Sequence, residues 1–254
     1  MYHKENASIA NIDFCADTGA EQGIVGFEEF RRRFPRCHVN FDKLEICAVK
    51  RDEVDSYAAN GCQKISSNFR ADGIYVTILL RRKKYELKLD TGFTGGIAMS
   101  AIDAKPFEKD RCHRYENKTG EFAVFPNKWF TIGNNYYNTA IVVANEDVSR
   151  LGVGIMKGFN WIFDFDKHEV YIQKNTLGLD AENTFPLFQV DVTQSGLVIT
   201  SKIKTSRQIS LGDIVTKVNG VSVTSENICE MKQMLNGKAN WDRVDIQTET
   251  QISK

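Results

Sequence analysis

One aspartate lies in a sequence context that could activate a water molecule. Residues 87–100 read LKLDTGFTGGIAMS, so one apolar strand runs into Asp90-Thr91-Gly92 and a second apolar strand follows. Hydrolysis by water needs one carboxylate to take a proton and another to donate one, and two aspartates about 3 Å apart share a single proton. Thr91 would hold the loop by hydrogen bonds, and Gly92 would let the backbone approach its twin closely. Asp90, Thr91 and Gly92 are therefore the candidate catalytic residues.

Two observations limit this interpretation. Asp-Thr-Gly is also good turn chemistry in any protein, so the tripeptide alone is weak evidence. A second copy begins at Asp17, but Asp17 lies only six residues before GIVGF at residues 23–27. Asp90 lies 62 residues before the comparable GVGIM at residues 152–156. The shorter gap favours a loop role for Asp17, which stays an alternative source of a second carboxylate.

The residues around Asp90 are expected to form a β-rich domain. Residues 74–80 read IYVTILL, rich in β-branched side chains, and YELKL at residues 85–89 alternates as a returning strand. Further strands are expected at residues 121–125, 129–132, 139–144, 161–165 and 169–173. Many short strands separated by turns favour an all-β, barrel-like fold. Trp129, Trp161 and Phe159 are expected to pack in its core.

An internal repeat accompanies this pattern. Residues 38–50 read HVNFDKLEICAVK and residues 162–174 read IFDFDKHEVYIQK, with five identities at an offset of 124. A glycine-containing apolar segment precedes each copy. The repeat predicts two related lobes, and residues 1–51 then correspond to the closing half of a partial first lobe.

These motifs together resemble the retropepsin-like aspartic peptidases, in particular the bacterial kind in which two lobes precede a PDZ domain. The resemblance covers residues 74–174 and is carried by LDTGFTGG, GVGIM and FNWIFDFDKHEVYI. It implies a mainly β, retropepsin-like lobe over residues 70–176, with Asp90 as a catalytic aspartate. It also implies a substrate flap around residues 115–127, with Gly120 near its tip.

A smaller α+β unit is expected over residues 184–254. Residues 211–223, LGDIVTKVNGVSV, resemble the PDZ pattern, in which a Gly-Asp turn leads a buried strand into an Asn-Gly turn. Ser225 is the expected N-cap of a helix to about Leu235, and residues 243–248 alternate as a last strand. The resemblance implies peptide binding by strand addition. The usual Gly-Leu-Gly-Phe loop is replaced at best by residues 185–188, so a small packing module is an equal alternative.

The sequence therefore predicts an aspartic-type endopeptidase acting on a peptide or protein substrate through water activated by Asp90. At the offset of 124, the counterpart of Asp90 would precede Met1, so one carboxylate is supplied where the mechanism needs two. A homodimer could pair two Asp90 side chains, although the partial first lobe could obstruct it. The alternative is a catalytically incomplete scaffold that binds peptides, partly through the C-terminal unit.

Composition and residue spacing argue against nucleic-acid binding, a membrane-spanning helix and a metal site. Lysine plus arginine equals aspartate plus glutamate at 33 each, so no basic excess points to nucleic acid. No stretch reaches the roughly 18 apolar residues of a membrane helix, and the opening residues lack a secretory signal, which leaves the compartment open. The four histidines and six cysteines show no metal-binding spacing, so we expect neither metal nor cofactor.

Overall fold

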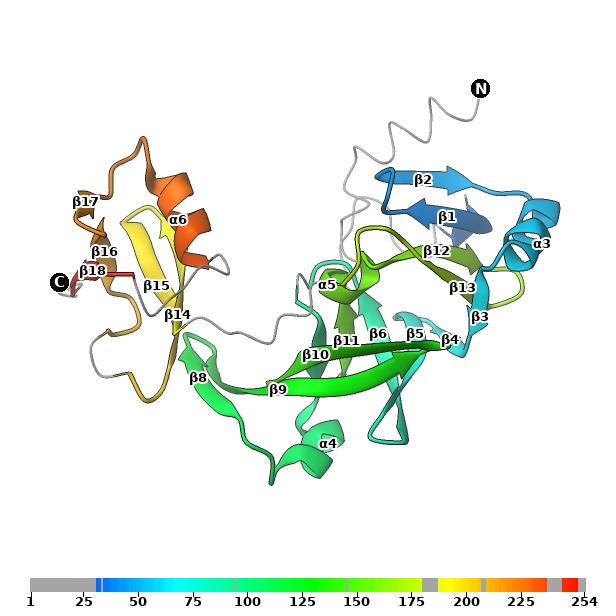
Figure 1. The fold of residues 1–254 in the computed structure, drawn as a ribbon, viewed down its shortest axis with the longest axis horizontal. Helices are drawn as coiled ribbons and strands as arrows, with labels where there is room; N and C mark the ends of the chain where they lie inside the picture. The colour runs from blue at the N-terminus through cyan, green and yellow to red at the C-terminus, as the bar shows by residue number, and fades with distance from the viewer. Residues whose placement is uncertain are drawn as a thin grey trace. The chain divides into compact units, whose positions relative to one another are not determined.

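Strands make up most of the secondary structure, which confirms the predicted mainly β class. The computed structural model describes residues 31–32, 34–93, 95–144, 146–179, 187–206, 209–236 and 244–250. Internal contacts divide the chain into two units (Figure 1). The first contains residues 1–108, 127–142 and 146–182, and the second contains residues 109–126, 143–145 and 183–254.

A ring of strands forms the body of the first unit. Its members are β5 (Gly73–Leu80), β6 (Lys83–Asp90), β7 (Ile97–Met99), β9 (Gly120–Ile132, from Asn127 onward in this unit), β10 (Asn135–Val143) and β11 (Arg150–Gly152). The hydrogen-bonded order is β5-β6-β11-β7-β10-β9, and β9 closes the ring on β5 through the pair Ile78–Ile132. Closure gives each of these strands a partner strand on both sides. β4 (Ser67–Arg70) extends β5 at its other end.

Period-two alternation explains the packing of the ring. On β5, Val76, Ile78 and Leu80 are fully buried, and Leu87 of β6, which pairs with Val76, is buried beside them. The sequence predicted a buried strand over residues 74–80 and an alternating strand over residues 85–89. The predicted strands 121–125 and 129–132 prove to be one continuous strand, β9.

Short helices lie between the strands of the first unit or follow them. They are α3 (Arg51–Ala59), α4 (Ala101–Ala104), the 3-10 helix η1 (Lys105–Phe107) and α5 (Val153–Met156). Ser100 caps α4, because its Oγ accepts a hydrogen bond from the Asp103 N–H at 3.2 Å.

The two copies of the repeat form matching hairpins beside the ring (Figure 1). They belong to a five-stranded sheet of order β2-β1-β12-β13-β3, with β1 (Arg36–Asn40), β2 (Glu45–Ala48), β12 (Phe159–Asp164), β13 (Glu169–Lys174) and β3 (Gln63–Ile65). Cys37 pairs with Ala48 in the first hairpin, and Trp161 pairs with Ile172 in the second, each residue shifted by the same 124 positions. Both turns place their last residue in the left-handed region, Leu44 at φ 54° and His168 at φ 53°.

The pairing between the hairpins is itself two-fold symmetric. β1 runs antiparallel to β12, and His38 pairs with Ile162, its own counterpart in the repeat. Each copy also contacts the turn of the other: Arg36 forms an ion pair with Asp166, and the Asn160 amide donates to Asp42 Oδ2 at 3.0 Å. Arg36 and Asn160 occupy equivalent positions, as do Asp42 and Asp166. A local two-fold axis therefore passes through the His38–Ile162 pair.

Aromatic side chains pack beneath this sheet. Trp161 and Phe159 are fully buried, as predicted, and the Trp161 indole N–H donates to the Met156 carbonyl at 2.8 Å. Cys37 is also fully buried, and burial raises its pKa to about 12, so its thiol stays protonated. The expectation for Trp129 was wrong: its side chain lies on the surface and is 53% exposed, because it falls on the outward face of β9.

The second unit is built around β15 (Gly196–Ile203). One side of β15 pairs with β14 (Phe188–Thr193), and the other pairs first with β16 (Ile214–Val218) and then with β8 (His113–Asn117). β17 (Val221–Ser222) and β18 (Ile246–Glu249) pair with β16, and α6 (Ile228–Asn236) packs on β14. The predicted Asn219-Gly220 turn is present, with φ values of 50° and 80°.

The start of α6 differs from the prediction. Ser225 is not the N-cap, because residues 224–227 form a separate turn in which Asn227 Oδ1 accepts the Thr224 N–H at 2.8 Å. The helix begins at Ile228, whose N–H reaches the Thr224 carbonyl. Asn227, not Ser225, therefore supplies the local side-chain hydrogen bond.

The segment expected to be a flap is a hairpin. Asn117 and Gly120 form its closing pair, and Gly120 has a φ of 135°, which favours glycine. β8 of this hairpin pairs with β15 from Tyr115–Ile203 to Asn117–Ser201. Residues 109–126 thus group with the C-terminal unit, an arrangement that the predicted boundaries 70–176 and 184–254 do not anticipate.

The symmetric hairpins offer a matched test of turn stability. Asp164 is fully buried and its Oδ1 accepts the N–H groups of Asp166 and Lys167, whereas its counterpart Asn40 accepts only that of Lys43. We expect Asp164→Ala to lower the free energy of unfolding by about 2–4 kcal/mol and Asn40→Ala by about 1 kcal/mol. Asp164→Asn, which keeps the acceptor, should cost less than Asp164→Ala. Urea unfolding measures all three, and equal losses at both positions would contradict the assigned role.

Candidate functional site

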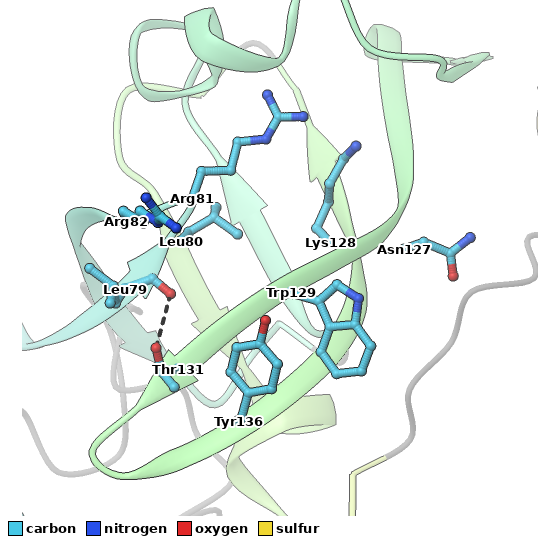
Figure 2. Close-up of a pocket in the computed structure, with 9 residues that line it drawn as sticks. All are labelled: Leu79, Leu80, Arg81, Arg82, Asn127, Lys128, Trp129, Thr131 and Tyr136. Carbon is cyan, nitrogen blue, oxygen red and sulfur yellow. Dashed lines mark hydrogen bonds between the residues drawn. The ribbon is translucent and has the colours of Figure 1, made fainter.

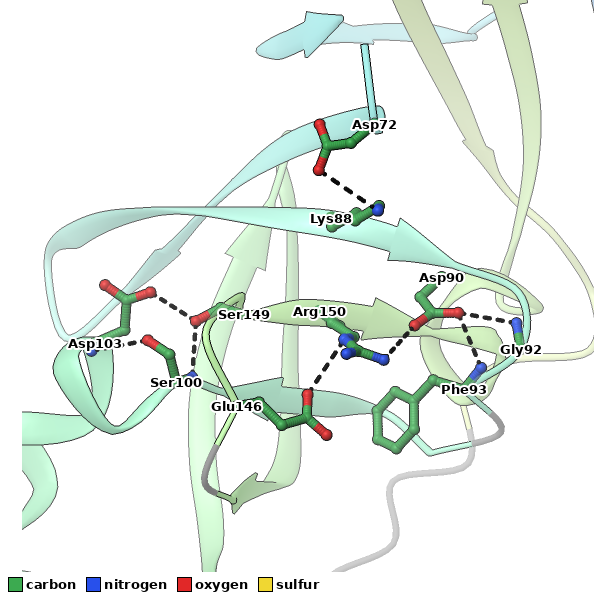
Figure 3. Close-up of polar contacts among 10 residues, drawn as sticks. All are labelled: Asp72, Lys88, Asp90, Gly92, Phe93, Ser100, Asp103, Glu146, Ser149 and Arg150. Atoms are coloured by element: carbon green, nitrogen blue, oxygen red, sulfur yellow. Dashed lines mark hydrogen bonds and ion pairs between the residues drawn. The ribbon is translucent and has the colours of Figure 1, made fainter. Parts of the chain in front are cut away.

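Asp90 lies at the C-terminal end of β6 and is 4% exposed. One carboxylate oxygen, Oδ1, accepts hydrogen bonds from the N–H groups of Gly92 at 3.0 Å and Phe93 at 3.2 Å (Figure 3). A carboxylate with two backbone donors is held in a single orientation. The turn chemistry of Asp-Thr-Gly is thus present, and it positions the side chain that the sequence identified.

The loop after Asp90 is fixed by the strand that passes it. β11 runs parallel to β6, with Gly152 opposite Asp90, and antiparallel to β7. The N–H groups of Gly152, Val153 and Gly154 donate to the carbonyls of Gly96, Phe93 and Gly95 at 2.8, 2.8 and 3.0 Å. The GVGIM segment of the sequence therefore supplies the backbone donors that hold the Asp90 loop.

The close packing around residue 152 leaves no room for a side chain, so glycine is required at this position. Its φ of −94° is open to any residue, but a Cβ atom would clash with the carbonyl oxygens of Phe93 and Gly95. Backbone atoms cannot move aside as a flexible side chain can, so the close approach needs a residue without a side chain. The glycine noted in the sequence has a packing reason that spacing alone did not reveal.

The second oxygen of Asp90 has a cationic partner. Arg150 Nη1 lies 3.0 Å from Asp90 Oδ2, and Arg150 Nε lies 3.2 Å from Glu146 Oε2 (Figure 3). Arg150 sits two residues before Gly152, so both its side chain and that of Asp90 lie on one face of the parallel strand pair. One guanidinium thus bridges two carboxylates. The sequence analysis missed Arg150 and Glu146.

Three further polar contacts lie on or beside these strands. Lys88, two residues before Asp90, forms an ion pair with Asp72 at 3.5 Å. The Ser149 hydroxyl donates to Asp103 Oδ2 at 2.6 Å and accepts the Ser100 N–H at 3.0 Å (Figure 3). These contacts anchor the start of β11 to the end of β7.

Two of the other predicted site residues lie in the turn after Asp90. Thr91 follows Asp90 as a half-buried turn residue, and Gly92 is exposed and donates to Asp90. Asp17, with Thr18 and Gly19, lies outside the described residues. Asp90 thus has fixed polar partners, and its catalytic role, like its partner carboxylate, stays a prediction.

Peptide binding by strand addition would meet an obstacle on β14. The Asn236 side chain donates to the Val190 carbonyl at 2.7 Å and accepts the Val190 N–H at 2.9 Å. Asp191 Oδ1 accepts the Val192 N–H at 2.8 Å and pairs with Lys232. Side chains of this unit therefore already satisfy the backbone groups that an added strand would need.

Within the described ranges, no group of three or more histidine, cysteine, aspartate and glutamate side chains is arranged to hold a metal ion. Cys37, Cys47, Cys62, Cys112 and Cys229 are free thiols. No described helix is long and apolar enough to span a bilayer.

No family model and no curated protein matches the chain. Among solved structures, it is similar to a retropepsin-like aspartic protease from Rickettsia conorii, with 22% identity and a TM-score of 0.35. The match covers 44% of this chain and 88% of that one.

The close approach at Gly152 predicts a large effect of a small change. Gly152→Ala should lower the free energy of unfolding by about 2–4 kcal/mol, because its Cβ would overlap two carbonyl oxygens. Gly96→Ala is the matched control, since its Cβ would first meet the Thr139 hydroxyl at 3.3 Å. Urea unfolding compares the free energies of unfolding of the two variants. A Gly152→Ala protein that is no less stable than Gly96→Ala would contradict the close approach of β11 to the Asp90 loop.

Proposed function

We propose that this chain supplies Asp90 as one catalytic carboxylate of an aspartic-type endopeptidase. The supporting observation is the orientation of Asp90: two backbone N–H groups hold Oδ1, and the loop that carries them is fixed by β11. This leaves Oδ2 as the oxygen that would face a second carboxylate. Such rigid placement is what shared-proton catalysis requires.

The chemistry needs both carboxylates. The ionised one takes a proton from water as the water oxygen bonds to the substrate carbonyl carbon, and the protonated one gives its proton to the carbonyl oxygen. Collapse of this intermediate breaks the C–N bond, and the leaving amine receives a proton from the pair. A single aspartate cannot perform both transfers at once.

The pairing of the β1–β2 hairpin with the β12–β13 hairpin helps to identify where a second carboxylate could come from. The edge of β12 at the local two-fold axis is occupied by β1 of the same chain. A second copy of the chain therefore cannot pair its own β12 there unless β1 leaves. This favours a partner carboxylate associated with the first repeat copy over a symmetric homodimer of two Asp90 sites, and Asp17 is the candidate in this sequence.

Arg150 must move for the proposed chemistry to proceed. Its guanidinium occupies the Asp90 oxygen that the second carboxylate would approach, and Glu146 already holds its other side. Arg150 is 39% exposed, so its side chain has room to swing toward Glu146. In this proposal Glu146 accepts Arg150 when the carboxylate pair assembles.

A second candidate function is a peptidase-like scaffold without catalysis. The observation in its favour is the same Arg150–Asp90 ion pair, which neutralises the carboxylate if it is permanent. Glu146 then serves only to complete a structural charge cluster. The two candidates differ in whether turnover exists and in whether Asp90 controls it.

Cleavage of a randomised peptide library between pH 4 and pH 7 tests the first candidate. Asp90→Asn should abolish turnover, because an amide cannot exchange the proton. Asp72→Asn is the matched control, since Asp72 is an exposed aspartate of the same unit that pairs with Lys88. Loss of cleavage in Asp90→Asn would support Asp90, and Asp17→Asn would then show whether Asp17 supplies the second carboxylate. Normal cleavage by Asp90→Asn would reject Asp90 as catalytic. Absence of turnover in every form would support the scaffold.

The role of Arg150 predicts opposite effects of two substitutions. Arg150→Met should raise kcat severalfold, because the competing cation is removed from Asp90. Glu146→Gln should lower kcat, because Arg150 then keeps Asp90 as its main partner. Steady-state kinetics on one cleavable peptide measures both, with thermal unfolding to verify folding. An inactive Arg150→Met protein beside an active parent would show that Arg150 assists catalysis.

A further inference from the structure

A pocket of about 370 Å³ opens on the first unit, away from Asp90 (Figure 2). The turn between β5 and β6 forms one wall, and residues of β9 form another. The turn precedes Lys83 at the start of β6, whereas Asp90 ends that strand. At about 3.3 Å per residue the two ends of β6 lie about 23 Å apart. The pocket is therefore a separate feature from the candidate active site.

Exposed apolar side chains line this pocket. Trp129 is 53% exposed, Tyr136 is 65% exposed and Leu79 is 40% exposed. The Trp129 and Tyr136 rings stack on each other, with centroids 4.9 Å apart and planes at 11°. Leaving a stacked aromatic pair in water forgoes the free energy of its burial. Tryptophan and tyrosine gathered in a concave site are typical of a binding surface.

Cations also line the pocket. Arg81, Arg82 and Lys128 line the pocket, and none of the described residues that line it is acidic. Arg81 is held in place, because its guanidinium lies 4.7 Å from the Phe107 ring centroid and donates to the Pro106 carbonyl at 2.9 Å. The pocket thus presents positive charge that is partly positioned before any ligand arrives.

The turn that carries two of these cations is strained. Arg81 and Arg82 have φ values of 51° and 63°, the left-handed region that asparagine and glycine adopt at far lower cost. Asn219-Gly220 forms a comparable two-residue turn elsewhere in the chain without that cost. A strained turn beside a pocket supports a hypothesis of function, here the presentation of two guanidinium groups.

We propose that this pocket binds an acidic polypeptide segment that carries one aromatic or leucine-sized side chain. Carboxylates of the segment would pair with the arginines, which suit planar, bidentate acceptors. The apolar side chain would lie against Trp129 and Leu79. A long polyanion is a poorer fit, because three cations line the pocket and the chain as a whole has balanced charge. If the proposed peptidase function holds, the pocket is a docking site for substrate outside the active site.

Fluorescence anisotropy with a labelled peptide tests the proposal. The peptide alternates Glu and Asp around one Phe, and its analogue replaces each acid by the amide. The full chain carrying Asp90→Asn is used, so cleavage cannot interfere and a failure of the peptidase proposal leaves this test intact. We expect the acidic peptide to bind at least about tenfold more tightly than the amide analogue, and salt to weaken it.

Variants then locate the site. Trp129→Ala and Arg82→Gly should each weaken binding about tenfold, whereas Lys84→Ala, a nearby exposed cation outside the pocket, should leave binding unchanged. Arg82→Gly also relieves the left-handed conformation, so its urea midpoint should not fall, and lost binding cannot be blamed on unfolding. Equal binding of the amide analogue, unchanged binding by both variants, or binding of dextran sulfate but not of the peptide would overturn the proposal.

Discussion

The close passage of β11 beside the loop after Asp90 is the constraint on which the candidate site depends. The N–H groups of Gly152, Val153 and Gly154 donate to the carbonyls of Gly96, Phe93 and Gly95, and a Cβ atom at Gly152 would clash with two of these carbonyl oxygens. This passage fixes the loop, and the loop in turn provides the two N–H groups that orient Asp90. Because buried backbone groups must be paired, displacing β11 would leave carbonyls of the loop without hydrogen bonds, so the loop and the strand depend on each other for stability. The order of the ring follows from the same passage. The two neighbours of β11 in the sheet, β6 and β7, are the strands that precede and follow the Asp90 loop.

The second organising feature is the two-fold pairing of the repeat. Isologous contacts form when equivalent surfaces meet, so each favourable interaction occurs twice, as with Arg36–Asp166 and Asn160–Asp42. The two contacts occupy equivalent positions but differ in chemistry: Arg36–Asp166 is an ion pair, whereas Asn160–Asp42 is a hydrogen bond from an amide to a carboxylate. Such divergence within a symmetric frame is expected when both halves belong to one chain, because each copy then changes independently.

Much of this could be predicted from sequence because the signals were local and periodic. The strand over residues 74–80, the Asp90 motif and the Asn219-Gly220 turn each follow from neighbouring residues, and the repeat at an offset of 124 indicated two related segments, which form equivalent hairpins. Arg150 could not be found in this way, because its meeting with Asp90 depends on a parallel pairing between strands 60 residues apart. Trp129 was misassigned for a related reason: its residue type favours a core, but the face of β9 on which it lies is decided by register. The start of α6 was missed because Ser225 and Asn227 are both good capping residues, and which one acts is decided by the turn they share with Thr224.

The Arg150–Asp90 pair connects these features to function. A buried carboxylate without a second acid beside it needs a counter-charge, since an isolated ion in the interior is costly. Arg150 provides that charge from a half-exposed position, and Glu146 gives it a second place to bind. A carboxylate meant only for structure would gain from a buried, permanent partner, whereas one meant to share a proton needs a partner that can withdraw. The partial exposure of Arg150 and its division between two carboxylates fit the second requirement better, and this is the physical argument for the proposed peptidase over the proposed scaffold.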